Sequence, residues 1–225
     1  SAATDADRAQ VARAAADFKS AAALQVQVTL FGSLVVVVLG LALFEGRRLT
    51  SMAEAQSFGG PVIHSTTSPY QRIVLSERGA GFALHLNGNL QFSSLDEHRY
   101  HEALVHPAMA AVASPRRVLV GGGGDGLAVR EILRWPEVER VVLVDLDPAV
   151  TDLARTNDRL VAQNRAALAD PKVSVVNADA MSFIADSSER FDVVVLDFPD
   201  PSNYSVGKLY STTLYTKVRR LLAPG

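Results

Sequence analysis

The chain has 225 residues, of which 48% are hydrophobic and 20% charged, with 15 glycines and 10 prolines. This composition is that of a folded domain and excludes a disordered, collagen-like or disulfide-stapled chain. Lys and Arg number 22 against 24 Asp and Glu, so the net charge is −2 and nucleic-acid binding by bulk electrostatics is not expected. The sequence has no cysteine, which excludes disulfides, thiolate nucleophiles and cysteine-ligated zinc.

An uncharged, apolar run lies near the N-terminus. Residues 20–44 carry no formal charge, and residues 28–44 read VTLFGSLVVVVLGLALF. About 20 apolar residues cross the roughly 30 Å hydrocarbon layer as a helix, so we predict a transmembrane helix over 24–44. A signal peptide fits poorly, because a long flank with acidic residues precedes the run. A buried helix or a Val-rich strand of a folded core stays open as an alternative.

Arg47 and Arg48 follow the apolar run directly. By the positive-inside tendency, they indicate that everything downstream lies in the cytoplasm, attached to the cell (inner) membrane.

Short strands are expected from Pro61 onward, at PVIHS, YQRIVLSE and GFALHLNGNLQF. Asn87-Gly88 lies between two apolar runs and indicates a type I′ hairpin turn. Ser94 and Glu97 match the spacing of a capping box, which predicts a helix from this point to about Val112.

Strands and helices then alternate. We expect strands at 117–121, 140–145, 172–177 and 191–197, and helices at 125–134, 148–168, 179–185 and 208–222. The segments RVLVG, RVVLVD and FDVVVLD are apolar throughout, as a parallel sheet buried on both faces requires. The pattern predicts an open, nucleotide-binding α/β sheet preceded by a small β-hairpin subdomain. The expected segments are an N-terminal stretch 1–23, the helix 24–44, a linker 45–60, the β subdomain 61–95 and the α/β domain 96–225.

A glycine-rich turn joins the first strand of this sheet to the next helix. It consists of Gly121, Gly122, Gly123 and Gly124, followed by Asp125. Glycines let the backbone turn sharply and approach a ligand, and the helix N-terminus offers free N–H groups. Such turns also occur for packing alone, but Asp145 ends the next strand, where a carboxylate binds ribose hydroxyls.

Asp125 narrows the class of ligand. A carboxylate in the turn would repel a pyrophosphate, so a cationic nucleoside with a sulfonium and an amine fits better than NAD or ATP. The alternative is that Asp125 only caps the helix.

Further carboxylates follow the remaining strands. Asp179 comes after the third strand, and Asp197 and Asp200 end the fourth in the sequence Asp-Phe-Pro-Asp-Pro. Asp and Pro also favour plain turns. Acidic residues at four successive strand ends nevertheless indicate a site that holds cations.

These motifs together resemble the spermidine synthase family, the polyamine aminopropyltransferases. The resemblance covers about Val62 to Gly225 and is carried by Tyr70-Gln71, LNGNLQFSSLDEHRYHEALVHP, VLVGGGGDGLAVREIL, LVDLDP, NADA and LDFPDP. With the apolar run ahead, the chain looks most like the membrane-bound bacterial branch. The resemblance implies a Rossmann-like, class I methyltransferase-type sheet.

The resemblance also implies the reaction, which is transfer of an aminopropyl group from decarboxylated S-adenosylmethionine to putrescine or a related amine. It implies no metal and no tightly bound cofactor. Attack requires a neutral amine, and therefore a general base.

The resemblance further implies a role for each site residue. Asp197 would be the base, assisted by Tyr100. The other implied contacts are Asp200 to the far amine, Asp125 and His101 to the aminopropyl or polyamine portion, Gln71 and Asp145 to the thioadenosine, and Asp179 and Ala180 to the adenine.

The chain departs from the family pattern at two places. Ser202-Asn203-Tyr204 stands where a Gly-Pro turn is usual, and Asp145 stands where many members have Glu. A complete synthase domain would also continue past Gly225 with strands that close the sheet. Taken without the resemblance, Tyr100 and His101 would more often be packing residues.

Two other functions stay open. A methyltransferase shares the sheet and the ribose carboxylate, and a non-catalytic polyamine-binding or transport-coupled module would share the acidic site. The other histidines show no metal-ligand spacing. Whether two chains form a homodimer is left open.

Overall fold

The computed structural model describes Lys19 and residues 24–43, 56–201 and 204–224. The chain divides into two compact units, Ser1–Glu54 and Ala55–Gly225. The predicted N-terminal stretch 1–23, apart from Lys19, lies outside the described residues, as do Arg47, Arg48 and most of the linker 45–60. So do Ser202 and Asn203.

The described part of the first unit is a helix over Leu24–Leu43. It has 20 residues with a mean hydropathy of 2.4, and its side chains are exposed. The Thr29 hydroxyl donates to the Gln25 carbonyl oxygen and the Ser33 hydroxyl to the Thr29 carbonyl oxygen, so these two hydroxyl groups are hydrogen bonded within the helix. The segment is therefore long and apolar enough to cross a membrane, and the strand alternative is wrong.

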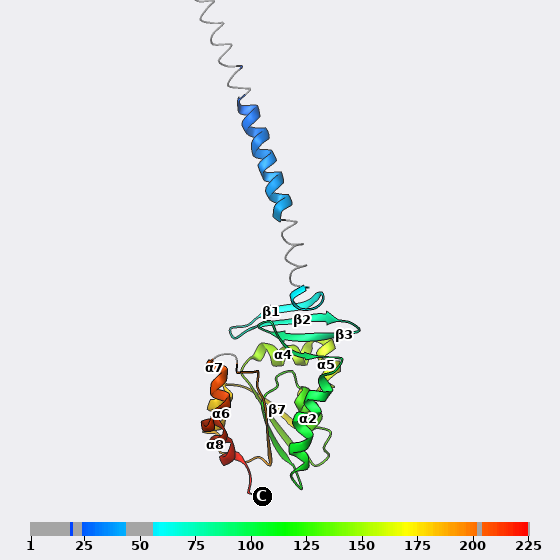
Figure 1. The fold of residues 1–225 in the computed structure, drawn as a ribbon, viewed down its shortest axis with the longest axis vertical. Helices are drawn as coiled ribbons and strands as arrows, with labels where there is room; N and C mark the ends of the chain where they lie inside the picture. The colour runs from blue at the N-terminus through cyan, green and yellow to red at the C-terminus, as the bar shows by residue number, and fades with distance from the viewer. Residues whose placement is uncertain (1–18, 20–23, 44–55, 202–203, 225) are drawn as a thin grey trace, which may run out of the picture. The chain divides into compact units, whose positions relative to one another are not determined.

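The second unit begins with an antiparallel sheet of four strands in sequence order (Figure 1). They are β1 (Val62–Thr67), β2 (Arg72–Arg78), β3 (Gly81–Leu86) and β4 (Asn89–Ser93). At the turn between β3 and β4, Asn87 and Gly88 have φ values of 50° and 82°. Two successive positive φ angles are those of the predicted type I′ turn.

The helix α2 (Glu97–Ala110) follows, but the predicted capping box does not form. The helix N-cap is Asp96, and the Ser94 hydroxyl accepts the Phe82 N–H across the sheet instead. The Glu97 side chain is thereby free of the helix terminus and bonds to Arg130.

A parallel sheet with strand order β7-β6-β5-β8 makes up the rest of the unit. The strands are β5 (Arg117–Gly122), β6 (Arg140–Asp145), β7 (Val173–Asn177) and β8 (Val193–Asp197). The connecting elements are α3 (Leu127–Ile132), α4 (Pro148–Thr156), α5 (Asp158–Asn164), η1 (Ala167–Ala169), α6 (Ala180–Asp186), α7 (Tyr204–Gly207), η2 (Lys208–Tyr210) and α8 (Thr212–Leu221). The predicted Rossmann-like order of strands and helices is confirmed.

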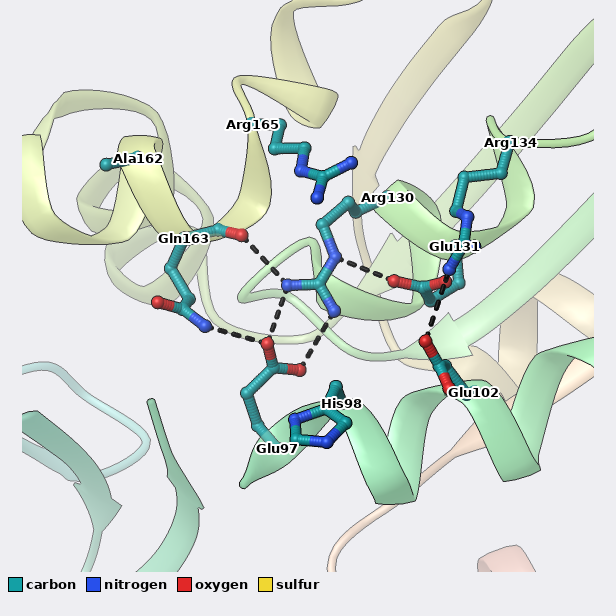
Figure 2. Close-up of a pocket in the computed structure, with 9 residues that line it drawn as sticks. All are labelled: Glu97, His98, Glu102, Arg130, Glu131, Arg134, Ala162, Gln163 and Arg165. Atoms are coloured by element: carbon teal, nitrogen blue, oxygen red, sulfur yellow. Dashed lines mark hydrogen bonds and ion pairs between the residues drawn. The ribbon is translucent and has the colours of Figure 1, made fainter. Parts of the chain in front are cut away.

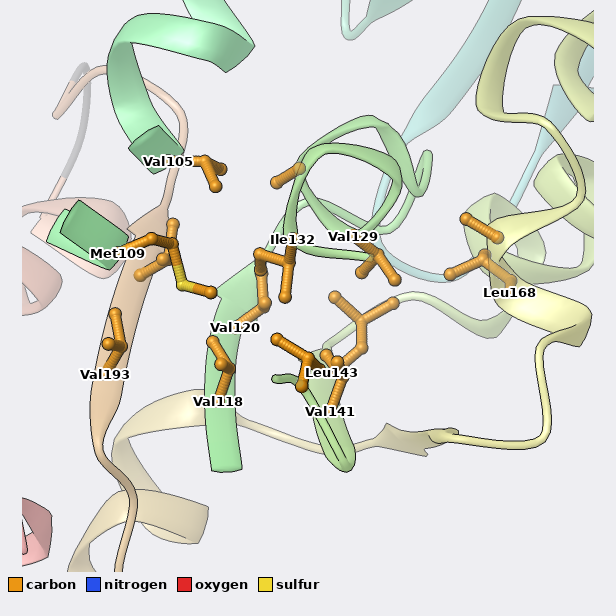
Figure 3. Close-up of a cluster of buried hydrophobic side chains, with 14 of the residues drawn as sticks. Val105, Met109, Val118, Val120, Val129, Ile132, Val141, Leu143, Leu168 and Val193 are labelled. Atoms are coloured by element: carbon orange, nitrogen blue, oxygen red, sulfur yellow. The ribbon is translucent and has the colours of Figure 1, made fainter. Parts of the chain in front are cut away.

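Apolar side chains cover both faces of this sheet. On one face, Val118 and Val120 of β5 pack with Met109 of α2 and Ile132 of α3, as Figure 3 shows. On the other face, Leu119 packs with residues of α6 and α8. The apolar strands are therefore buried on both sides, which leaves the strand ends as the places for polar chemistry.

The antiparallel sheet packs against the helices on the first of these faces. Leu75 and Leu84 join a cluster with Leu127, Val150 and Leu160, which belong to α3, α4 and α5. The start of β2 lies beside the turn that precedes α4, where Ser68 and Gln71 donate to Asp147.

Candidate active site

The glycine-rich turn lies at the carboxyl edge of the parallel sheet and makes close contact with its neighbours. Gly122 and Gly123 have φ values of 79° and 68°, which side-chain-bearing residues rarely adopt. A Cβ on Gly122 would clash with the Asp197 carbonyl oxygen, and one on Gly124 would meet the Asp145 carboxylate at 2.7 Å. The turn therefore requires glycine because two acidic residues lie directly against it.

The predicted catalytic pair is brought together. Tyr100 on α2 donates its hydroxyl to Asp197 Oδ1 at 2.8 Å, although the two residues are 97 positions apart. Burial raises the pKa of Asp197, while the Tyr100 hydrogen bond and the charge of His101 act in the opposite direction. Burial and the Asp197 charge raise the pKa of Tyr100, so its hydroxyl stays a donor. None of the described residues donates to Asp197 Oδ2, which leaves that oxygen able to take a proton.

Asp125 lies in the glycine-rich turn and belongs to the same electrostatic cluster. Burial raises its pKa to about 6, with His101 lowering it and Asp197 raising it. Its Oδ1 accepts the Leu127 N–H at 2.9 Å, so the helix-capping interpretation is correct for one oxygen. A carboxyl group that ionises near pH 6 is well suited to respond to a cationic ligand.

His101 is buried, with 2% of its surface exposed, and its ring packs edge-on against Tyr100. Burial disfavours the imidazolium, but the hydrogen bond to Glu97 and the charges of Asp125 and Asp197 outweigh it, so the pKa of His101 is raised. The packing role expected of a lone helical histidine is therefore combined with charge coupling to the site.

Asp145 ends β6 and is held by the backbone. Its Oδ2 accepts the Gly124 N–H at 3.0 Å and its Oδ1 accepts the Asp147 N–H at 2.9 Å. Burial raises its pKa, while these two hydrogen bonds lower it. Asp145 therefore stiffens the glycine-rich turn, and its contact with the ribose stays a prediction.

Gln71 reaches the site from the antiparallel sheet through a residue that the sequence analysis did not single out. Its Nε2 donates to Asp147 Oδ2 at 3.0 Å, and the Ser68 hydroxyl donates to the same oxygen at 2.6 Å. Asp147 Oδ1 caps α4 through the Ala149 N–H. The buried Asp147 thus joins the two sheets, and the LVDLDP string that contains it was the available signal.

Asp179 and Ala180 lie where the adenine contact is expected, at the start of α6. Asp179 Oδ1 caps this helix through the Ser182 N–H, and Oδ2 pairs with Lys208 Nζ at 2.7 Å. Ala180 is buried beside it. Lys208, another residue missed from the sequence, thus ties the segment after β8 to the predicted nucleoside end of the site.

Asp200 is exposed and stands apart from the other carboxylates in burial. The loop that carries it is held by Tyr210, whose hydroxyl lies 3.0 Å from both the Phe198 and Pro199 carbonyl oxygens. Burial raises the pKa of Tyr210, and the charge of Asp200 adds to this effect. Asp200 therefore lies near Tyr210, at the outer end of the acidic cluster.

Another acidic group lies outside the predicted site. Among the described residues, Glu102, His106 and Glu131 place potential metal-ligand atoms within 4.8 Å of one another. Arg134 Nη1 pairs with both carboxylates of this group, at 3.2 Å and 2.6 Å. Both acids of this group are thus already paired with an arginine.

A strand–glycine turn–helix unit, with a carboxylate after the next strand, defines the Rossmann-like, class I methyltransferase-type proteins. Residues 97–225 match the family of the spermine/spermidine synthase domain. The chain belongs to this family.

Relatives and solved structures agree with this placement. Polyamine aminopropyltransferase 2 of Ralstonia nicotianae is 52% identical over 83% of this chain and 37% of its own length, and the Oceanobacillus iheyensis enzyme is 48% identical over 86% and 38%. A spermidine synthase in complex with the transition-state analogue AdoDATO has a TM-score of 0.67 at 32% identity, over 72% of this chain and 54% of that one. The Thermotoga maritima spermidine synthase has a TM-score of 0.65 at 31% identity, over 72% and 53%. The chain thus spans less than two fifths of the length of these curated relatives.

Proposed function

We propose that the protein is a polyamine aminopropyltransferase that makes spermidine and methylthioadenosine from putrescine and decarboxylated S-adenosylmethionine. The observation that carries this proposal is the hydrogen bond between Tyr100 and Asp197 beside Asp125, Asp145 and the glycine-rich turn. The names of the relatives support the same reaction.

The chemistry follows from the charges at the site. The amine nitrogen of putrescine attacks the aminopropyl carbon bound to the sulfonium, the carbon–sulfur bond breaks, and its electron pair leaves with the sulfur as neutral methylthioadenosine. The nitrogen loses one proton, which Asp197 Oδ2 takes. Burial makes this carboxylate a stronger base than an exposed one, and the Tyr100 hydroxyl holds it in place.

The other site residues bind and orient the two cations. Asp125 and His101 hold the aminopropyl or polyamine portion, and Asp200 holds the far amine of putrescine. Gln71 and Asp145 bind the thioadenosine, and Asp145 contacts its ribose. Asp179 and Ala180 contact the adenine. The site needs no metal, because the substrates themselves carry the positive charge that the carboxylates attract.

The same proposal includes a membrane location. The helix Leu24–Leu43 spans the cell membrane, and Arg47 and Arg48 keep the domain that carries the site on the cytoplasmic side. The domain boundaries expected from the sequence, with the β subdomain at 61–95 and the catalytic domain from 96, go with this arrangement.

The identity of the nucleoside product tests the reaction. The whole protein is incubated with putrescine and either decarboxylated or ordinary S-adenosylmethionine, and the nucleosides are separated by chromatography. Methylthioadenosine from the decarboxylated donor alone is the expected result. S-adenosylhomocysteine from the ordinary donor would show a methyltransferase, and bound polyamine with neither nucleoside would show a binding module.

A further inference from the structure

A buried carboxylate that takes no part in the reaction described above contacts His101. Glu97 is 5% exposed and lies one helical turn before His101 on α2. Arg130 donates to it from Nη1 at 2.6 Å and from Nη2 at 3.0 Å, and Gln163 Nε2 donates at 2.7 Å (Figure 2). These hydrogen bonds hold the carboxylate in one orientation.

The Glu97 contact fixes which nitrogen of His101 carries a proton. His101 Nδ1 lies 2.8 Å from Glu97 Oε2 and 2.8 Å from the Glu97 carbonyl oxygen. A carbonyl oxygen only accepts hydrogen bonds, so Nδ1 must be the donor. When the ring is neutral, Nε2 therefore carries a lone pair and no proton.

The Glu97 carboxylate has the charge that this arrangement requires. Burial favours the neutral acid, but the hydrogen bonds from His101, Arg130 and Gln163 lower the pKa of Glu97 to about 2, so the carboxylate is ionised at neutral pH. The charged or titratable groups that act on His101 are Glu97 and Tyr100 from α2, Asp125 from the glycine-rich turn and Asp197 from the end of β8.

We infer, resting on the proposed aminopropyl transfer, that Glu97 is a positioning residue: it keeps the His101 proton on Nδ1, so that Nε2 accepts a hydrogen bond from the cationic amine held by Asp125 and Asp197. With the opposite tautomer, His101 would present an N–H group to a cation, which is the unfavourable polarity. Glu97 thus acts on the acidic site indirectly, through the His101 ring. It also lines the cavity of about 300 Å³ drawn in Figure 2, which none of the predicted site residues lines.

The tautomer of His101 tests this inference directly. In the ¹⁵N-histidine-labelled whole protein in detergent micelles, NMR of the ring nitrogens, assigned with His101→Gln, is expected to show the neutral ring protonated on Nδ1. The Nε2–H tautomer predominates for histidine free in water, so the two results are clearly distinct. A neutral His101 protonated on Nε2 in the unmodified protein would overturn the inference.

Variants then test whether the positioning matters to the reaction. Glu97→Gln is expected to lower the pKa of His101 and to reduce kcat about tenfold to a hundredfold, as loss of a hydrogen bond that orients a metal-ligating histidine does. Glu131→Gln is the matched control, because it removes the same charge from Arg130, at 2.9 Å on the Nε side, without contacting His101. This control is expected to leave the pKa of His101 unchanged.

The double variant separates positioning from folding. In the His101→Gln background, Glu97→Gln is expected to change kcat less than twofold, because the residue through which it acts is gone. If Glu97→Gln lowered kcat in that background by the same factor as it does alone, Glu97 would act through folding, and the inference would be overturned. If the unmodified protein makes no spermidine, the proposed function fails, and with it this role; the wrong tautomer with normal turnover overturns the inference alone.

Discussion

The two sheets of the second unit are built by different rules and contribute differently to the site. In the antiparallel sheet, the edge strand β1 alternates between half-buried and exposed residues, and a tight turn joins β3 to β4. In the parallel sheet, β5 and β6 are buried along nearly their whole length and end in the glycine-rich turn and Asp145. Side chains along a doubly buried strand have no access to ligand, so its chemistry gathers at one edge.

The two sheets therefore contribute unequally to the site. The parallel sheet supplies the turn and the carboxylates Asp125, Asp145 and Asp197 from neighbouring strand ends. The antiparallel sheet supplies one predicted ligand residue, Gln71, and joins the site through Asp147. This difference predicts that substitutions at the carboxyl edge of the parallel sheet lower the reaction rate. Substitutions where the two sheets meet should mainly lower the stability of the fold.

The largest effect is expected at the end of β8. Asp197→Asn removes the proposed base, and we expect a loss in kcat of about 10²- to 10⁴-fold, the usual contribution of general base catalysis. Asp192→Asn, directly before the opposite end of β8, keeps an oxygen that accepts the Arg116 and Arg117 N–H groups. Steady-state rates are expected to be near normal in Asp192→Asn, and equal losses in both variants would contradict the importance of the carboxyl edge.

The contact between the two sheets is expected to show a smaller effect, on stability. Asp147→Ala removes the cap of α4 and leaves Ser68 and Gln71 without their acceptor, which should cost about 2 kcal/mol in the free energy of unfolding. Urea denaturation followed by Trp135 fluorescence measures it. Asp152→Ala, exposed on the same helix, is the control. An unchanged midpoint for Asp147→Ala would mean that the two sheets do not depend on this contact.

Binding of the cationic substrate should depend on pH through Asp125. Burial raises the pKa of Asp125 to about 6, and a cation binds better to the ionised carboxylate than to the neutral acid. The affinity for the cationic substrate is therefore full above about pH 6 and falls as the pH drops through this value. Between pH 7 and pH 5, we expect putrescine affinity to fall about tenfold, the effect of a single such protonation. Calorimetric titration measures the change, and Asp125→Asn should be much less dependent on pH over the same interval.

The smallest effect is expected where Lys208 pairs with Asp179. Both side chains are substantially exposed, and such pairs contribute about 0.2–1 kcal/mol. Lys208→Met should therefore change methylthioadenosine affinity no more than about fivefold, in equilibrium binding. A loss of a hundredfold would mean that Lys208 itself contacts the nucleoside.

Much of the fold followed from local sequence signals. Runs of apolar residues located the parallel strands, and Asn87-Gly88 located the hairpin turn, because these features depend on neighbouring residues alone. The capping box predicted at Ser94 does not form, because that prediction also used only neighbouring residues. Ser94 is engaged across the sheet by Phe82, a contact that spacing along the chain does not reveal.

The candidate site, too, was predictable from the sequence only where it depends on local signals. Asp125, Asp145 and Asp197 could be placed at one edge, because the carboxyl ends of parallel strands meet there. Asp147 was missed because its partner Gln71 is 76 positions away, and Glu97 because its partner Arg130 is 33 positions away. The roles of Tyr100 and His101 came from family resemblance, and their ligand contacts stay predictions.

The most direct test of the aminopropyl transfer follows the transferred group itself. Decarboxylated S-adenosylmethionine deuterated in its aminopropyl chain is mixed with unlabelled putrescine and the whole protein, and the polyamines are examined by mass spectrometry. We predict spermidine that carries the full deuterium label, formed by the unmodified protein and by Asp192→Asn but not by Asp197→Asn. Unlabelled or methylated putrescine as the only amine recovered, with the donor bound, would contradict the proposed reaction.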